Sequence, residues 1–413
     1  MTVPTDDDLN ARAARVLAGG ATHVARSYRP AIHVERARGA RKWLVDGREL
    51  VDYTMGHGAL LLGHAHPAVV EAVDRQLHEG THFGAGSRLE VEWAERIAAA
   101  VPSVDRVRFT SSGTEATMLA LRLARAATGR DIVAKVAEHF HGWGDSVVAG
   151  LGPAGAPLLP SGVPGAVGET VLVLPSLAPE VVAAALRAGD VAALILEASG
   201  ARFGWLPLPP EHVLEAARLC GEAGTLLVVD EVVTGFRVGR DGMQGRLGVR
   251  ADLSAFAKVV AGGLPGGAVG GRADVMDLLA VPDDETGERF VSHPGTFNAN
   301  PLSAAAGIAA LDAIESLGAR TRAEAFAAAL EEAWGGEIAA AGLGGRVWRL
   351  SSIVHLSLDD PAADARLGIR MREEGVDCLR TSAFCSAVHG DADLERSVAA
   401  LRRALPRSVS VGA

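Results

Sequence analysis

The chain has 413 residues, of which 48% are hydrophobic, and carries a formal net charge of −10 at pH 7. This length exceeds one simple core and indicates about two or three domains. The acidic balance, without a run of basic residues, argues against a nucleic-acid partner, and no apolar run approaches the roughly 18 residues of a membrane span. The three cysteines, Cys220, Cys378 and Cys385, have neither metal-ligand nor disulfide spacing, and the acidic N-terminus lacks an apolar signal core. We therefore expect a cytoplasmic protein with small-molecule partners and no metal site.

Apolar periodicity predicts the elements in chain order. A short helix at 8–17 precedes a strand–turn–strand segment within 31–54, and two helices follow at 68–80 and 89–102. Strands and helices then alternate, with strands at 106–109, 132–136, 170–174, 191–197 and 225–233 and helices at 114–129, 179–188 and 210–223. Helices are expected at 301–318 and 321–341, a strand near 346–358, and a closing helix at 391–405.

The strands of the central region are apolar throughout, as expected for strands buried on both faces of a mostly parallel sheet. We therefore predict an α/β fold with a large α/β domain at 51–297. A smaller α+β domain is expected from the two chain ends, 1–50 and 298–413.

The segment "FTSSGTEATM" opens a helix with Ser111, Ser112, Gly113 and Thr114. A helix N-terminus has unpaired N–H groups and the positive end of the helix dipole, which suit a phosphate. Serine and threonine are also favoured as ordinary N-caps, so this segment alone leaves both interpretations open.

Lysine occurs only at positions 42, 135 and 258, although the chain has 40 basic residues. Arginine serves as well in ion pairs, but only lysine readily loses its proton and forms an imine, so the isolated Lys258 in "LSAFAKVVAGG" is a candidate for Schiff-base chemistry. Asp230 ends an earlier buried strand, where α/β sheets place ligands. A phosphate-binding helix end, a carboxylate and a lysine are the three groups that pyridoxal 5'-phosphate requires.

The sequence resembles the fold-type I, class III pyridoxal phosphate-dependent aminotransferases, and most closely their glutamate-1-semialdehyde 2,1-aminomutase subgroup. Six ordered blocks carry the resemblance: "LVDYTMGHGALLLGHAHPAV", "SSGTEATMLALRLARAATGR", "FHG", "VVDEVVTGFRVG", "AKVVAGGLPGGAVGGRADVM" and "HPGTFNANPLSAAAG". It runs from about residue 18 to at least 310, with a weaker match near 375–400.

The resemblance implies the cofactor roles. Lys258 would be the Schiff-base lysine and proton shuttle, and Asp230 would pair with the pyridinium nitrogen. Thr296 matches a residue that the family contributes from a partner subunit, which implies a homodimer. The other expected cofactor residues are Ser112, Gly113 and Thr114 at the phosphate, Phe140 (commonly tyrosine in the family) and His141 beside the ring, Val232 against a ring face, and Glu197.

The substrate positions depart from the aminomutase. Arg26 matches its carboxylate-binding arginine, but His23, His57, Arg202 and Cys385 replace its serine, tryptophan, asparagine and glutamate. These changes favour a small, anionic amino compound other than glutamate 1-semialdehyde, with Arg26 and Arg202 as carboxylate partners. The alternative is that Arg202 points outward or pairs with an acidic residue of the protein, which would leave a pocket for neutral amines.

We interpret the sequence as an aminotransferase that uses an amino donor and a carbonyl acceptor. A 2,1-aminomutase is the alternative, and decarboxylase or epimerase activity on the same scaffold also remains open. A non-catalytic regulator is disfavoured, because the chain has no spare length for a DNA-binding or partner domain and retains Lys258. The Gly/Pro-rich segment 150–168 is either an active-site gate or a passive surface loop.

Overall fold

The computed structural model describes residues 5–23, 31–281 and 290–409. The chain forms two compact units: residues 68–316 make the large unit, and residues 1–67 with 317–413 make the small unit. Both boundaries lie later in the chain than the 50/51 and 297/298 limits that the sequence suggested. Strand β3 (Glu49–Asp52) of a small-unit sheet extends across the predicted 50/51 limit, whereas helix α13 (Pro301–Ser316) packs on helix α4 (Arg88–Ala100) of the large unit.

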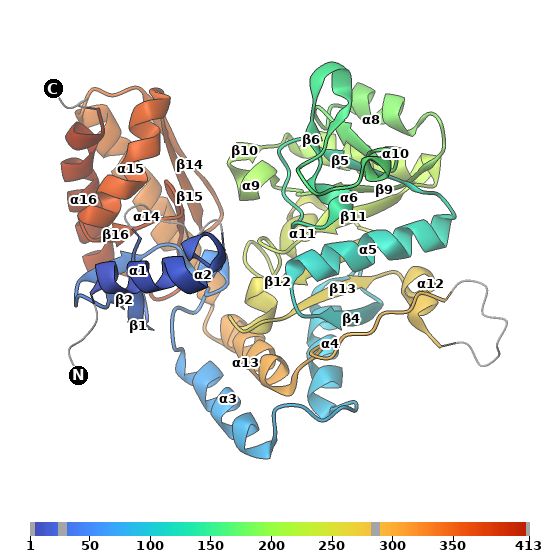
Figure 1. The fold of residues 1–413 in the computed structure, drawn as a ribbon, viewed down its shortest axis with the longest axis horizontal. Helices are drawn as coiled ribbons and strands as arrows, with labels where there is room; N and C mark the ends of the chain where they lie inside the picture. Colours follow the sequence, from blue (N-terminus) through green and yellow to red (C-terminus); the bar gives the residue numbers. More distant parts are fainter. Residues whose placement is uncertain (1–4, 24–30, 282–289, 410–413) are drawn as a thin grey trace. The chain divides into compact units, whose positions relative to one another are not determined.

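A seven-stranded sheet with the order β4-β13-β12-β11-β9-β5-β8 forms the centre of the large unit (Figure 1). Strands β12, β11, β9, β5 and β8 are parallel, and only β13 runs antiparallel to its neighbours β12 and β4. The predicted mostly parallel α/β architecture is therefore confirmed. The strands are β4 Arg106–Thr110, β5 Ile132–Val136, β8 Val171–Leu174, β9 Val191–Leu196, β11 Leu226–Asp230, β12 Leu253–Ala257 and β13 Gly267–Gly271.

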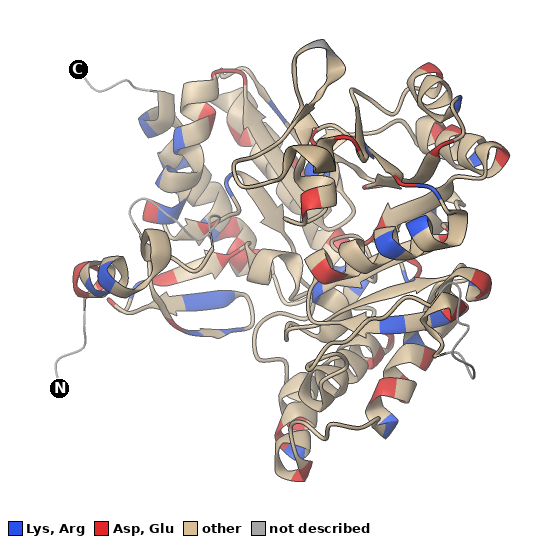
Figure 2. Ribbon diagram, turned by 45° about the vertical axis from the view of Figure 1, so that its right-hand side comes forward, with Lys and Arg blue, Asp and Glu red and all other residues tan. Residues whose placement is uncertain are grey.

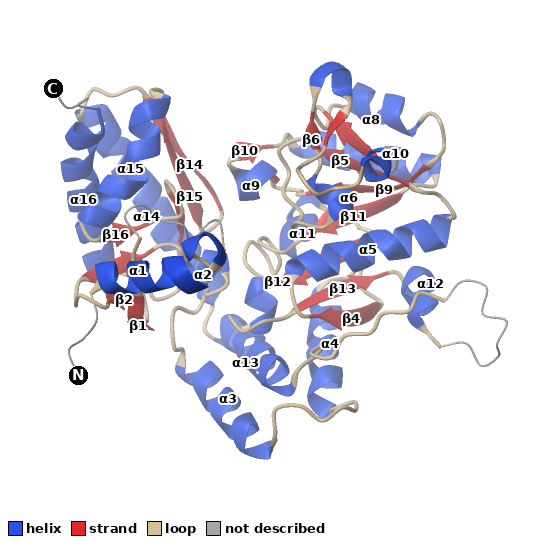
Figure 3. Ribbon diagram, in the orientation of Figure 1, coloured by secondary structure: helices blue, strands red, loops and turns tan. Residues whose placement is uncertain are grey.

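Helices cover both faces of this sheet (Figure 3). Ile195 of β9 packs with helix α5 (Gly113–Thr128) in one core cluster, and the adjacent Leu194 packs with α8 (Pro179–Leu186) and α10 (Pro210–Ala223) in another. Successive strand residues thus point into opposite apolar layers, which explains why these strands are apolar throughout. The unit's other helices include α3 Pro67–Glu79, α6 Asp145–Val148, α9 Ala201–Gly204, α11 Gly242–Leu247 and α12 Ala273–Met276.

Strand β13 was not predicted, because its sequence GAVGG lacks the side chains that mark a strand. Its glycines are required by close packing instead. A Cβ atom on Gly267 would lie 2.6 Å from the carbonyl oxygen of Ser112, and one on Gly271 would lie 2.4 Å from that of Asp252. The strand therefore fits between β12 and β4 only without side chains at these positions.

The segment 150–168 is more structured than the predicted loop. It contains a short antiparallel pair, β6 (Gly150–Leu151) with β7 (Pro157–Leu158), followed by the helical turn α7 (Gly165–Gly168). Whether this segment gates a site stays a prediction.

The small unit has two sheets, of order β1-β2-β3-β16 and β14-β15-β17. One strand was predicted near 346–358, but this segment forms two antiparallel strands, β14 (Gly345–Leu350) and β15 (Ile353–Leu358). The turn between them includes Ser351, which has φ 53°. Trp334 and Tyr53 are buried in its core. The remaining elements are α1 Asp6–Val16, β1 Val34–Arg38, β2 Arg41–Leu44, α2 Met55–Gly58, α14 Ala319–Ala340, α15 Pro361–Glu373, β16 Val376–Asp377, β17 Ser382–Phe384 and α16 Asp391–Val409.

Acidic and basic residues are interspersed along the helices of each unit (Figure 2). No single helix in the described parts of the chain is both long and apolar enough to cross a membrane. Helices α13 and α14 reach that length and composition only as a pair, which is bent at the break between them.

Candidate active site

The start of α5 confirms the N-cap interpretation, and phosphate binding there stays a prediction. The Ser112 side chain is an ordinary N-cap, since it accepts a hydrogen bond from the Glu115 N–H at 3.2 Å. The first intrahelical bond runs from the Ala116 N–H to the Ser112 carbonyl oxygen. By helix geometry, the N–H groups of Gly113 and Thr114 have no acceptor within the helix, and they are the groups that can hold a phosphate.

Asp230 ends β11 and is fixed by two hydrogen bonds. One carboxylate oxygen lies 2.8 Å from Nδ1 of His141, and the other accepts the Val232 N–H at 3.0 Å. His141 is in turn held by Thr117, whose hydroxyl donates to the His141 carbonyl oxygen at 2.7 Å. This role of Thr117 could not be predicted from local sequence, because its contact is with a loop 24 residues away. The arrangement presents an oriented carboxylate at the carboxyl edge of the sheet.

Glu197 connects the loop that follows β5 with the loop that follows β9. Its buried carboxylate accepts the backbone N–H groups of Phe140 at 2.9 Å, Arg202 at 3.0 Å and Phe203 at 2.8 Å. Burial raises the pKa of Glu197, while the bonds from Phe203 and Phe140 oppose that rise. The predicted site residue Glu197 therefore organises backbone at the sheet edge.

Lys258 follows directly after β12 and has a left-handed backbone, with φ 56°. The pKa of Lys258 is lowered to about 8, mainly by burial and to a smaller extent by Arg237, against the opposing charges of Asp230 and Glu197. A left-handed lysine at the end of a buried strand is an unfavourable conformation that is typical of functional sites. Lysine with such a pKa has a substantial neutral fraction near physiological pH, as a nucleophile or base needs.

Gly113 allows the start of α5 to pack closely against the residues around Asp230 and Lys258. A Cβ atom at Gly113 would lie 2.9 Å from both methyl groups of Val232 and 3.4 Å from the Cβ of Ala257, the residue before Lys258. The start of α5, the Val232 side chain and the end of β12 are therefore packed together. The predicted cofactor residues Gly113, Val232, Asp230 and Lys258 share one edge of the sheet.

The site fits pyridoxal phosphate. Nε2 of His141 is buried and has no hydrogen-bond partner among the described residues, so a polar group remains to be satisfied by a ligand or water. The helix end would hold the phosphate, Asp230 the ring nitrogen and Lys258 the aldehyde carbon. Phe140 and Thr296, expected beside the ring and in a partner's site, are both exposed in the single chain, and the Thr296 carbonyl oxygen lies 2.6 Å from Nε2 of His82.

The predicted substrate residues are divided between the units. In the small unit, the rings of His23 and His57 lie 5.7 Å apart, and His57 has a left-handed backbone with φ 57°. Cys385 is fully buried in the small-unit core, so its side chain takes part in packing. Arg26 lies outside the described residues. Their contact with substrate stays a prediction.

Arg202 belongs to the large unit, and its Nη2 lies 2.5 Å from Oε2 of Glu138. Pairing of Arg202 with an acidic residue of the protein was the alternative to a substrate contact, but local sequence does not identify Glu138 as that residue. Its pairing with Arg202 means that the predicted second carboxylate partner already has an intramolecular acceptor.

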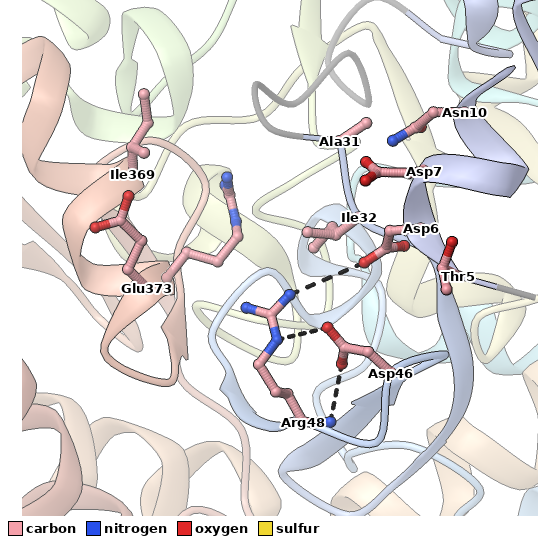
Figure 4. A pocket seen from close by; sticks show the side chains of 11 residues that line it. Thr5, Asp6, Asp7, Asn10, Ala31, Ile32, Asp46, Arg48, Ile369 and Glu373 are labelled. Atoms are coloured by element: carbon pink, nitrogen blue, oxygen red, sulfur yellow. Dashed lines mark hydrogen bonds and ion pairs between the residues drawn. The ribbon is translucent and has the colours of Figure 1, made fainter.

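A separate pocket of about 330 Å³ lies in the small unit (Figure 4). None of its lining residues is a predicted site residue. Three of its charged groups pair with one another, since Arg48 lies 2.7 Å from Asp46 and 3.9 Å from Asp6. In the described parts of the chain no group of His, Cys, Asp or Glu side chains is arranged to hold a metal ion. His64, from "GHAHP", bonds Asp52 at 2.7 Å.

A family model for aminotransferase class-III matches residues 23–381. The chain belongs to this family. A glutamate-1-semialdehyde 2,1-aminomutase from Sorangium cellulosum (strain So ce56) is 38% identical to this class III aminotransferase chain, with 97% of the chain and 96% of the relative covered.

Two solved structures match the fold closely. An omega-transaminase from Sphaerobacter thermophilus has a TM-score of 0.91 at 31% identity and covers 98% of each chain. A transaminase with PLP bound has a TM-score of 0.92 at 32% identity and covers 99% of each chain. The fold is thus the fold-type I architecture, and the cofactor of this class III aminotransferase is pyridoxal 5'-phosphate.

Proposed function

We propose that this class III family member is an aminotransferase that acts on a small, anionic amino compound. The observation that carries the proposal is the placement of Lys258, whose pKa is lowered to about 8, beside the fixed carboxylate of Asp230. The bound cofactor would supply an electron-withdrawing ring that stabilises negative charge at the substrate carbon.

The chain's own residues hold and move protons around that ring. Asp230 would keep the ring nitrogen protonated, and His141 would hold the Asp230 carboxylate in position through its 2.8 Å contact. Lys258 is prepared to accept a proton at Nζ from the substrate carbon and to deliver it again, because burial favours its neutral form. Gly113 and Thr114 would hold the phosphate at the helix end.

The anionic substrate is inferred from the chain's arginines. Arg26 matches a carboxylate-binding position, and Arg202 lies in the loop organised by Glu197. Cys385 supplies no carboxylate to neutralise Arg26, while His23 and His57 add hydrogen-bond donors. An amino acid whose carboxylate meets Arg26 satisfies these features.

The second candidate is a glutamate-1-semialdehyde-type 2,1-aminomutase, because curated relatives with that name are 37–40% identical over most of the chain. The two functions differ in stoichiometry. An aminomutase converts glutamate 1-semialdehyde alone, whereas an aminotransferase requires a donor and a separate carbonyl acceptor. Steady-state turnover of each single compound and of donor–acceptor pairs distinguishes them, and turnover of the semialdehyde alone as the best reaction would reject the aminotransferase.

A homodimer is part of this proposal. Phe140, Trp143 and Phe297 are 66%, 79% and 62% exposed in the single chain, which is unusual for large apolar side chains. Phe297 is adjacent to Thr296, the residue that the family contributes to a partner's site. A second copy that covers these side chains would bury them.

The experiment that tests the substrate class compares Arg26→Ala and Arg202→Ala on an amino acid and on its decarboxylated amine. Loss of a charged hydrogen bond costs about 1.5–3 kcal/mol, or roughly tenfold to a hundredfold in kcat/KM. We expect Arg26→Ala to impose this penalty on the amino acid only, and Arg202→Ala to impose it only where the amino acid carries a second carboxylate. Equal penalties on both compounds would reject an anionic substrate.

A further inference from the structure

We propose that Glu138 determines substrate specificity by competing with a substrate carboxylate for Arg202. The inference rests on the proposed function, since it assumes an anionic group at this edge of the site. It assigns a role to an acid that neither the sequence motifs nor the family resemblance identifies.

The two residues occupy the edge of the sheet that carries Asp230 and Lys258. Glu138 follows β5, and Arg202 follows β9 in the turn α9. Because β5 and β9 are parallel neighbours, the loops after them emerge side by side at their carboxyl ends. Parallel α/β sheets bind ligands at this edge.

Both residues are held by backbone that is unfavourable for their types. Glu138 has φ 64°, Arg202 φ 54° and Phe203 φ 51°. Left-handed conformations of non-glycine residues are disfavoured and occur mainly where other contacts impose them. The buried carboxylate of Glu197 binds the N–H groups of Arg202 and Phe203, and that of Phe140, two residues after Glu138. Glu197 therefore helps to position both of the loops that carry the pair.

The pair itself is easily opened. The side chains of Arg202 and Glu138 are 46% and 56% exposed, and exposed ion pairs contribute little to stability. An ion pair without a function needs no unfavourable backbone. This pair connects two loops with left-handed residues at the end of the sheet where ligands bind. A substrate carboxylate can replace Glu138 as the acceptor of Arg202 without leaving a buried charge unpaired.

Two opposite effects follow. With Glu138 present, Arg202 is neutralised and substrates with one carboxylate are accepted without an unpaired cation. A second carboxylate on the substrate must first displace Glu138. The Glu138→Gln variant keeps the side-chain shape but removes the competing charge, so it should favour dicarboxylates, and Arg202→Gln should disfavour them.

The test uses the cofactor-loaded protein and two inert probes of equal chain length, glutarate and pentanoate, with affinities measured by calorimetry. We expect Glu138→Gln to raise the ratio of glutarate to pentanoate affinity about twofold to fivefold, the strength of an exposed ion pair. Arg202→Gln should lower the ratio about tenfold. In the Arg202→Gln background, Glu138→Gln should have no further effect. Glu138→Asp should keep the ratio closer to the original value than Glu138→Gln does.

A matched control is Glu222→Gln. Glu222 forms an exposed pair with Arg218 at the end of α10, just before β11 begins and hence at the opposite edge of the sheet. It should leave the ratio unchanged. Three results would overturn the proposal. The ratio of glutarate to pentanoate affinity could stay unchanged in Glu138→Gln. Glu138→Gln could change the ratio as much when Arg202 is already replaced by Gln, or Glu222→Gln could change it as much as Glu138→Gln does. The probes report binding alone, so this result does not depend on turnover. Failure of every amino donor to react would reject the aminotransferase function without deciding the role of Glu138.

Discussion

The pKa of Lys258 in the cofactor-free protein can be measured directly, since the chain has only three lysines. Burial lowers the Lys258 pKa from 10.5 to about 8. At pH 7.5 this raises the neutral fraction from about one in a thousand to about one in four. The perturbation is Asp230→Asn, which removes the charge that raises the Lys258 pKa, so the variant should titrate lower than the wild type.

The assay is an NMR titration of protein labelled with ¹³C-lysine. Three lysine signals are expected, and Lys→Arg variants assign them to Lys42, Lys135 and Lys258. A Lys258 signal with a midpoint near 10.5, or one that moves upward in Asp230→Asn, would refute the reasoning.

The same shift has a consequence for stability with a defined sign. A lysine whose folded pKa lies below its unfolded value destabilises the folded state when protonated. The cost is at most about 3 kcal/mol, because one pKa unit corresponds to 1.36 kcal/mol and part of the side chain stays exposed. This cost to the free energy of unfolding is present below about pH 8, declines between pH 8 and 10.5, and is absent above that range. Lys258→Met should therefore stabilise the cofactor-free protein at pH 7, and denaturant unfolding should show this gain vanish near pH 10.5.

Three further predictions concern the cofactor site and assembly. Asp230→Asn should retain the cofactor, measured by its absorbance after dialysis, but lose most transamination activity because the ring nitrogen is no longer held protonated; a wild-type rate would contradict this role. Gly113→Ala should lower the free energy of unfolding by about 1–3 kcal/mol and weaken cofactor binding, because the added Cβ would lie 2.9 Å from Val232; unchanged stability and affinity would show that the contact is not tight. Light scattering of the active protein should give a homodimer, and an active monomer would exclude a contribution of Thr296 to a partner's site.

Much of the large unit follows from its apolar periodicity. The strand that ends in Asp230 and the helix that opens with Ser112 and Gly113 were predicted from local sequence, because both are specified by residues close in the chain. Strand β13 was not, since its glycines are selected by close packing against Ser112 and Asp252 rather than by strand propensity.

The site shows the same division. Lys258 and Asp230 were identified because their residue types are chemically distinctive in an apolar context. Thr117 and Glu138 were missed, because each acts through a partner distant in sequence, 24 and 64 residues away. Hydrogen bonds of this kind depend on strand order and on loop conformation, neither of which is visible in local periodicity.

The central claim is that Lys258 carries the cofactor. Reduction of the cofactor-loaded protein with borohydride, followed by peptide mass mapping, tests it most directly, because only three lysines can be modified. We expect a cofactor-derived mass on the peptide that contains Lys258 and none on those with Lys42 or Lys135. Labelling of either of those lysines in place of Lys258 would contradict it.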